Sequence, residues 1–135
     1  MRLDIKKDLK GIYNYLLNED IRSYFLSDDF KEFCEKNLDI KEIWSESEKY
    51  ANNMNFLLFS FRGKSEIIEV SFVIFLEKIT NLGKDKFLEI ILKIIKDFMK
   101  SKNREVNLDD IYKNIKNLNY TIEEVTEVFK TIQLK

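Results

Sequence analysis

Residues 84–102 constrain the fold more than any other segment. Nearly every position is apolar except for one narrow polar stripe, whose members recur at helical spacing: Lys86, Glu89, Lys93, Lys96, Asp97 and Lys100. This pattern predicts an α-helix that exposes one strip of its surface and buries the rest. Because such a helix must be covered by other elements, we expect it to lie at the centre of the molecule.

Helices are predicted on both sides of this segment. Apolar residues at helical spacing predict a first helix over about residues 5–17, which Gly11 weakens slightly, and a turn or two of helix over 20–26. Towards the C-terminus, the same spacing predicts two helices that form a hairpin joined through residues 117–120.

Four helix starts carry a side chain suited to capping the first turn. Such a side chain accepts a hydrogen bond from a backbone N–H that has no partner within the helix. A capping box, in which an acidic side chain three residues on bonds back to the cap, is expected at Asp39 and at Thr121. The expected caps are Ser27, Asp39, Asn107 and Thr121.

The stretch from residue 55 to 76 allows two interpretations. Its two apolar runs could form a β-hairpin around Gly63, which would make the fold α+β. We favour one helix to about residue 62 and another over 65–82, because Gly63 and Gly83 each follow a long apolar run. A left-handed glycine at such a position ends a helix.

The sequence as a whole predicts an all-α fold. Of its 135 residues 44% are hydrophobic, which is enough for one core, and it contains no Pro and only three Gly. No linker or low-complexity segment divides it. We therefore expect a single helical domain over residues 1–135, built as an irregular bundle of about six to seven helices.

The residue types that carry most enzyme chemistry are missing or isolated. The chain has no His, the side chain best suited to proton transfer near neutral pH and the commonest zinc ligand. Cys34 is the single cysteine, and its neighbours Phe30 and Phe33 predict a buried, inert thiol. We therefore expect a protein that is not an enzyme and that has no cofactor or metal.

Two motifs resemble ligand sites but depart from the required pattern. Gly63-Lys64-Ser65 has the ending of a phosphate-binding P-loop, yet Leu58 stands where the first Gly is required. The carboxylates of residues 28–35 lack the loop spacing and the turn Gly of an EF-hand. A helix–helix turn and a solvated acidic surface explain the same residues.

Nothing in the sequence predicts export or a membrane span. Residues 1–8 mix charges with apolar side chains and lack the apolar core of a signal peptide. The longest apolar runs are far shorter than the roughly 20 residues that a spanning helix needs. A lone cysteine suits a reducing compartment, so the cytoplasm is the expected location. The abundance of Lys, Ile, Asn and Phe, whose codons are AT-rich, indicates a low-GC genome such as that of a bacterium or its phage.

Charge is nearly balanced overall but polarised along the chain. Residues 19–50 contain ten acidic and five basic residues, whereas residues 84–104 contain seven basic and three acidic ones. We expect the first segment to dock on another protein, as an adaptor, an assembly subunit or a small inhibitor of a host complex. The expected contact is an acidic face formed by Asp28, Asp29, Glu32, Glu35 and Glu42.

The alternative is accessory nucleic-acid binding by the second segment. Its contacts would come from a basic stripe formed by Lys86, Lys93, Lys96, Lys100 and Arg104. Glu89 and Asp97, four positions either side of Lys93, are expected to neutralise part of it through intrahelical pairs. Assembly into a homo-oligomer stays open.

Overall fold

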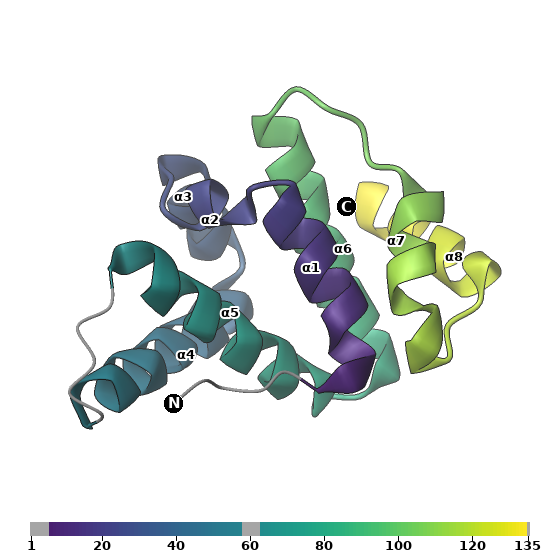
Figure 1. The fold of residues 1–135 in the computed structure, drawn as a ribbon. Helices are drawn as coiled ribbons and strands as arrows, with labels where there is room; N and C mark the ends of the chain where they lie inside the picture. The colour runs from purple at the N-terminus through teal and green to yellow at the C-terminus, as the bar shows by residue number, and fades with distance from the viewer. Residues whose placement is uncertain (1–5, 58–62, 135) are drawn as a thin grey trace.

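The chain is all-α in the computed structural model, which describes residues 6–57 and 63–134. Over these residues it forms eight α-helices, two short 3₁₀ helices and no strand (Figure 1). The α-helices are α1 (Lys10–Asn18), α2 (Ile21–Phe25), α3 (Asp28–Lys36), α4 (Leu38–Leu57), α5 (Lys64–Thr80), α6 (Lys84–Ser101), α7 (Leu108–Ile115) and α8 (Ile122–Gln133). The 3₁₀ helices are η1 (Lys7–Leu9) and η2 (Lys116–Leu118).

The all-α prediction is confirmed, and the alternative of a hairpin over 55–76 is wrong because residues 64–76 are helical. Whether the preceding helix reaches residue 62 lies outside the described residues. There is one helix more than the upper end of the predicted range, because α2 is separate from its neighbour. Asp20 adopts the left-handed conformation, with φ at 65°, and thereby breaks the helix between α1 and α2.

α6 lies at the centre, as its pattern predicted. Figure 1 shows it running through the middle of the molecule, with α2 and α3 on one side and α7 and α8 on the other. It packs against α2, α3, α5 and α8, and nine of its eighteen side chains are buried.

Along the parts of the chain that the structure covers, no helix is long and apolar enough to cross a bilayer.

A cluster of aromatic rings joins the N-terminal helices to α5. The ring of Phe25 stacks on Trp44 at 4.3 Å between centroids and lies 5.1 Å from Phe72. Trp44 in turn meets the ring of Phe75 edge-on at 5.5 Å. Aromatic pairs at these separations add to the stability gained from burial, so this cluster anchors α2 and α4 on α5.

Three of the four predicted caps are confirmed. The side chains of Ser27 and Asn107 accept the expected backbone hydrogen bonds, at 3.3 and 3.1 Å. Thr121 forms the complete capping box at the start of α8. The fourth prediction, a cap at Asp39, is wrong because α4 begins one residue earlier, at Leu38. The carboxylate of Asp39 instead accepts from the N–H of Ile40 and pairs with Lys86.

The prediction of two left-handed helix stops needs correction. Gly63 has φ −70° and ψ 167° and is the N-cap of α5, so the extended backbone at its position is open to any residue. Gly83 does have a positive φ of 104°, but it is the N-cap of α6, and α5 ends at Thr80. The chain reverses within three residues there, through a conformation that only Gly adopts without strain.

Gly11 is needed for a close approach between helices that the sequence did not reveal. A Cβ atom at Gly11 in α1 would lie 2.7 Å from the backbone oxygen of Asn114 in α7. The absence of a side chain therefore sets the distance between these two helices, although Gly lowers the intrinsic helix propensity of α1.

We predict that Gly11→Ala lowers the free energy of unfolding by about 1–3 kcal/mol, because the overpacking outweighs the roughly 1 kcal/mol gained in helix propensity. Urea denaturation followed by circular dichroism measures this change. Gly63→Ala is the control, since nothing lies within 4 Å of a Cβ there, and it should change stability by less than about 0.5 kcal/mol. A stabilised Gly11→Ala protein would contradict the close packing of α1 on α7.

Candidate functional site

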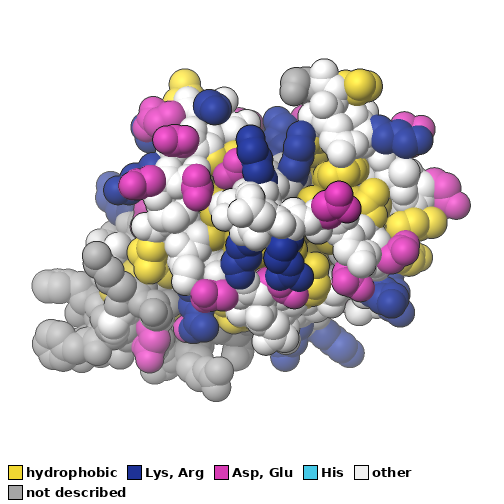
Figure 2. Space-filling view, turned by 90° about the horizontal axis from the view of Figure 1, so that it is seen from above, with side chains coloured by type: hydrophobic (Ala, Val, Ile, Leu, Met, Phe, Trp, Pro, Cys, Tyr) yellow, Lys and Arg dark blue, Asp and Glu magenta, His cyan; other side chains and the backbone are white. Residues whose placement is uncertain are grey.

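The acidic face is exposed as predicted. α3 supplies its first four members and α4 supplies Glu42, and all five side chains are exposed. α3 buries Phe30, Phe33 and Cys34 on its other side, which directs the carboxylates outward. Acidic side chains can be seen gathered over α3, on the left of Figure 2.

Three members of the acidic face form no ion pair with any residue that the structure describes: Asp29, Glu32 and Glu42. Of the other two, Asp28 lies 3.9 Å from Lys31, and Glu35 forms an ion pair with Lys41. Leu38 begins α4 directly beyond this helix and is 64% exposed. It lies four residues before Glu42 and therefore on the same face of α4.

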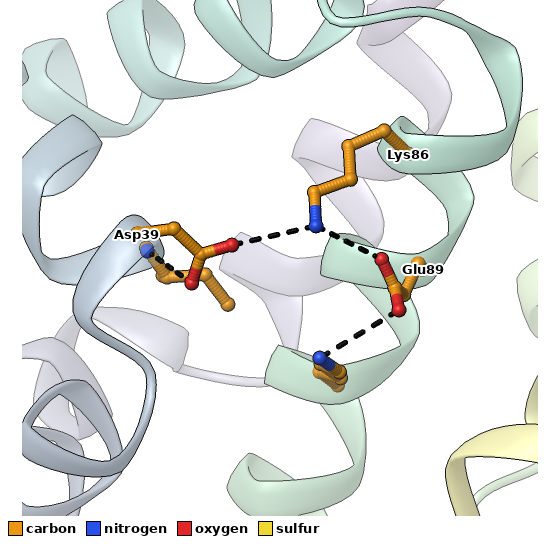
Figure 3. Close-up of polar contacts among 5 residues, drawn as sticks. Asp39, Lys86 and Glu89 are labelled. Carbon is orange, nitrogen blue, oxygen red and sulfur yellow. Dashed lines mark hydrogen bonds and ion pairs between the residues drawn. The ribbon is translucent and has the colours of Figure 1, made fainter.

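The basic stripe is divided by its ion pairs. Lys86 contacts Asp39 of α4 at 3.4 Å and Glu89 at 3.1 Å. Glu89 also contacts Lys93, at 3.7 Å. Figure 3 shows how the ammonium group of Lys86 lies between the carboxylates of Asp39 and Glu89. The N-terminal half of the stripe therefore ties α6 to α4, a contact that the local pattern around Asp39 did not predict.

The pKa shifts at this contact follow from the same arrangement. Burial alone would raise the pKa of Asp39, but the N–H of Ile40 and the ammonium group of Lys86 hold it below its usual value. The hydrogen bond to Glu89 raises the pKa of Lys86, and Asp39 adds to that shift while partial burial opposes it. Both groups are therefore stabilised in their charged forms.

We predict that Asp39→Asn lowers the free energy of unfolding at pH 7 by up to about 1 kcal/mol, since the pair is partly exposed. A carboxyl group whose pKa is lowered in the folded state stabilises the protein at pH values above its pKa in the unfolded chain, which is about 4. That stabilisation is lost as the pH falls through the folded-state pKa. The difference from the wild type should therefore disappear near pH 2. Denaturant titrations at the two pH values test this, with the fully solvated Asp28→Asn as control. An equal difference at both pH values would contradict the ion pair.

The carboxylate of Asp97 binds Tyr24 rather than Lys93, the partner that the sequence predicted. The hydroxyl of Tyr24 in α2 donates a 2.6 Å hydrogen bond to the carboxylate of Asp97 in α6. Burial and then this bond raise the pKa of Tyr24 far above its usual range, so the phenol stays protonated. The expected pairing of Glu89 with Lys93 is confirmed, whereas Asp97 binds a tyrosine 73 residues away in sequence. No local signal could have indicated that contact.

The C-terminal half of the basic stripe is open. Within the described chain, Lys96 and Lys100 form no ion pair, and Arg104 pairs with Glu19. A cleft of about 330 Å³ separates the end of α6 from α3 and is lined by Asp29, Glu32 and Lys100, among others. Figure 2 shows basic side chains in the middle of this face, beside the acidic ones over α3. The two surfaces that the sequence offered as alternatives are therefore neighbours.

No known protein family, characterised protein or solved structure matches this chain.

Cys34 lies where its aromatic neighbours predicted. It is buried in the core, and that burial raises the pKa of its thiol to about 11. Because the thiolate is the reactive form, a thiol with this pKa is a poor nucleophile at neutral pH. Elsewhere in the described chain, no three His, Cys, Asp or Glu side chains are grouped to hold a metal ion.

We predict that Cys34 of the folded protein reacts with a disulfide reagent at least about 100-fold more slowly than the urea-unfolded chain at neutral pH, because the thiol is both buried and protonated. Absorbance of the released thiolate follows the reaction. A Cys34→Ser, Ser45→Cys protein carries an exposed thiol on α4 and should react at the unfolded rate. Rapid labelling of folded Cys34 would contradict its burial.

Proposed function

We propose that the protein is a non-enzymatic interaction module that docks on a basic partner protein through the acidic face. The observation that carries this proposal is a set of exposed carboxylates, those of Asp29, Glu32 and Glu42, which pair with no cation in the described part of the chain and lie next to the exposed Leu38. Carboxylates that no described cation neutralises remain available to a partner. An apolar side chain bordered by charge is a common form of protein contact, with an apolar centre and a polar rim.

The charge of the face sets the chemistry of the partner. Unneutralised carboxylates favour a surface rich in Lys and Arg, and they speed association and select against acidic competitors more than they add affinity. Leu38 would supply the apolar contact at the centre of the face. An adaptor, an assembly subunit or a small inhibitor of a host complex would each use such a face.

Nucleic-acid binding by the whole basic stripe has less support. Affinity for nucleic acid grows with the number of phosphates that Lys and Arg neutralise. Lys86, Lys93 and Arg104 already contact carboxylates of this chain. Two members of the five remain unpaired within the described part of the chain, which is a small footprint for a duplex.

The test combines photo-crosslinking in the producing cells with charge reversal. A photoreactive residue replacing Glu32 should capture one discrete protein through a Lys- or Arg-rich peptide, whereas the same residue at Glu123 should not. In binding assays with that protein, the triple variant Asp29→Lys, Glu32→Lys, Glu42→Lys should weaken affinity at least about tenfold.

A matched control carries the same change in net charge on side chains outside the acidic face. Glu105, Asp109 and Glu123 are exposed and form no ion pair with the described residues, so their replacement by Lys should alter affinity by less than about twofold. Equal losses in both triple variants, or none in either, would overturn the proposed docking face.

A further inference from the structure

The C-terminal end of α6 forms one wall of a pocket that the acidic face does not include. The pocket lies between α6, the connection over residues 102–107 and the last turns of α8, and its volume is about 590 Å³. That volume falls within the range of roughly 300–1,000 Å³ that is typical of small-molecule sites. Lys96, Lys100 and Arg104 contribute to its lining, and Glu105 is its carboxylate.

The turn after α6 brings these cations together. Asn103 adopts a left-handed φ of 55°, and the N–H of Arg104 returns to the carbonyl of Met99 at 2.9 Å. Arg104 is thereby folded back beside the helix end that carries Lys100. Its guanidinium donates to the Glu19 carboxylate, which holds it in position while further N–H groups remain.

The charges of the pocket favour an anion. Lys96 and Lys100 have no ion-pair partner among the described residues, and they outnumber the one carboxylate in the lining even when the charge of Arg104 is set against Glu19. Lys100 also lines the cleft that holds Asp29, Glu32 and Asp97, so it borders both hollows. A phosphate group would accept hydrogen bonds from both lysines and from Arg104, and charge-assisted bonds of this kind are strong.

An apolar surface lies beside these cations. Phe129 of α8 and Val106 line the pocket, and both are half-buried because they also pack against the hydrophobic core. An aromatic ring fixed in this way offers a flat face on which a planar ring can stack. The pocket therefore combines a phosphate-binding side with a ring-binding side.

We infer that this pocket binds a nucleotide, with the phosphate on Lys96, Lys100 and Arg104 and the base against Phe129. The inference does not rest on the proposed docking face, because no member of the acidic face lines this pocket. The shared chemistry is a phosphate joined to a flat base, which a free mononucleotide and the phosphorylated end of a strand both supply. Glu105 lies in the lining and weakens the attraction.

The test is an NMR titration of the full chain with AMP, with adenosine and with inorganic phosphate. AMP should shift the amide signals of Asn103, Arg104 and Phe129 and bind at least about tenfold more tightly than either fragment, since it uses both sides of the pocket. No shift with about 10 mM AMP, or phosphate binding as tight as AMP binding, overturns the inference. A 5′-phosphorylated oligothymidylate that binds more tightly than TMP identifies a strand end, and weaker binding identifies a free nucleotide.

Variants separate the pocket from general charge attraction. Lys96→Gln with Lys100→Gln should weaken AMP binding at least about tenfold, whereas the exposed pair Lys113→Gln with Lys130→Gln should change it by less than about twofold. Phe129→Leu should weaken AMP but not phosphate, and Glu105→Gln should tighten both. Equal effects of the two lysine pairs would overturn the site. Amide spectra that remain dispersed confirm that each variant is folded.

Discussion

Burial of α6 is the constraint on which the rest of this structure depends. The helix is apolar on all but one strip, so α2, α3, α5 and α8 must cover it. One hollow lies on the α3 side of α6 and another on its α8 side, so this helix both supports the fold and borders the candidate sites.

The stripe has two halves with different roles. Near the start of α6, Lys86 lies between Asp39 and Glu89 and joins α6 to α4 (Figure 3). Near its end, Lys96 and Lys100 have no such partners among the described residues. The difference arises from the carboxylates within reach of each half, since Asp39 of α4 and Glu89 of α6 hold Lys86 at the first, whereas no described carboxylate forms an ion pair with Lys96 or Lys100 at the second. The cation at one end of the stripe therefore stabilises the fold, whereas the cations at the other end remain available for binding.

The acidic face and the open end of the stripe share one side of the molecule (Figure 2). The proposed docking surface and the proposed nucleotide pocket flank the same helix, with Lys100 between them. Asp97 lines the cleft beside the acidic face, where the hydroxyl of Tyr24 donates a hydrogen bond to its carboxylate. A ligand on one side of Lys100 would change the field felt on the other, since this side chain lines both hollows.

The sequence by itself determined what depends on neighbours along the chain: the all-α class, the buried faces and the caps at Ser27, Asn107 and Thr121. Hydrophobic periodicity and capping act within one or two turns, so they can be read locally. Only the tertiary structure decided that α7 packs closely against Gly11, that Asp39 binds Lys86 and that Phe129 lies beside the end of α6. Each of these depends on which helices pack together, and that choice is made by the shape and volume of the whole core.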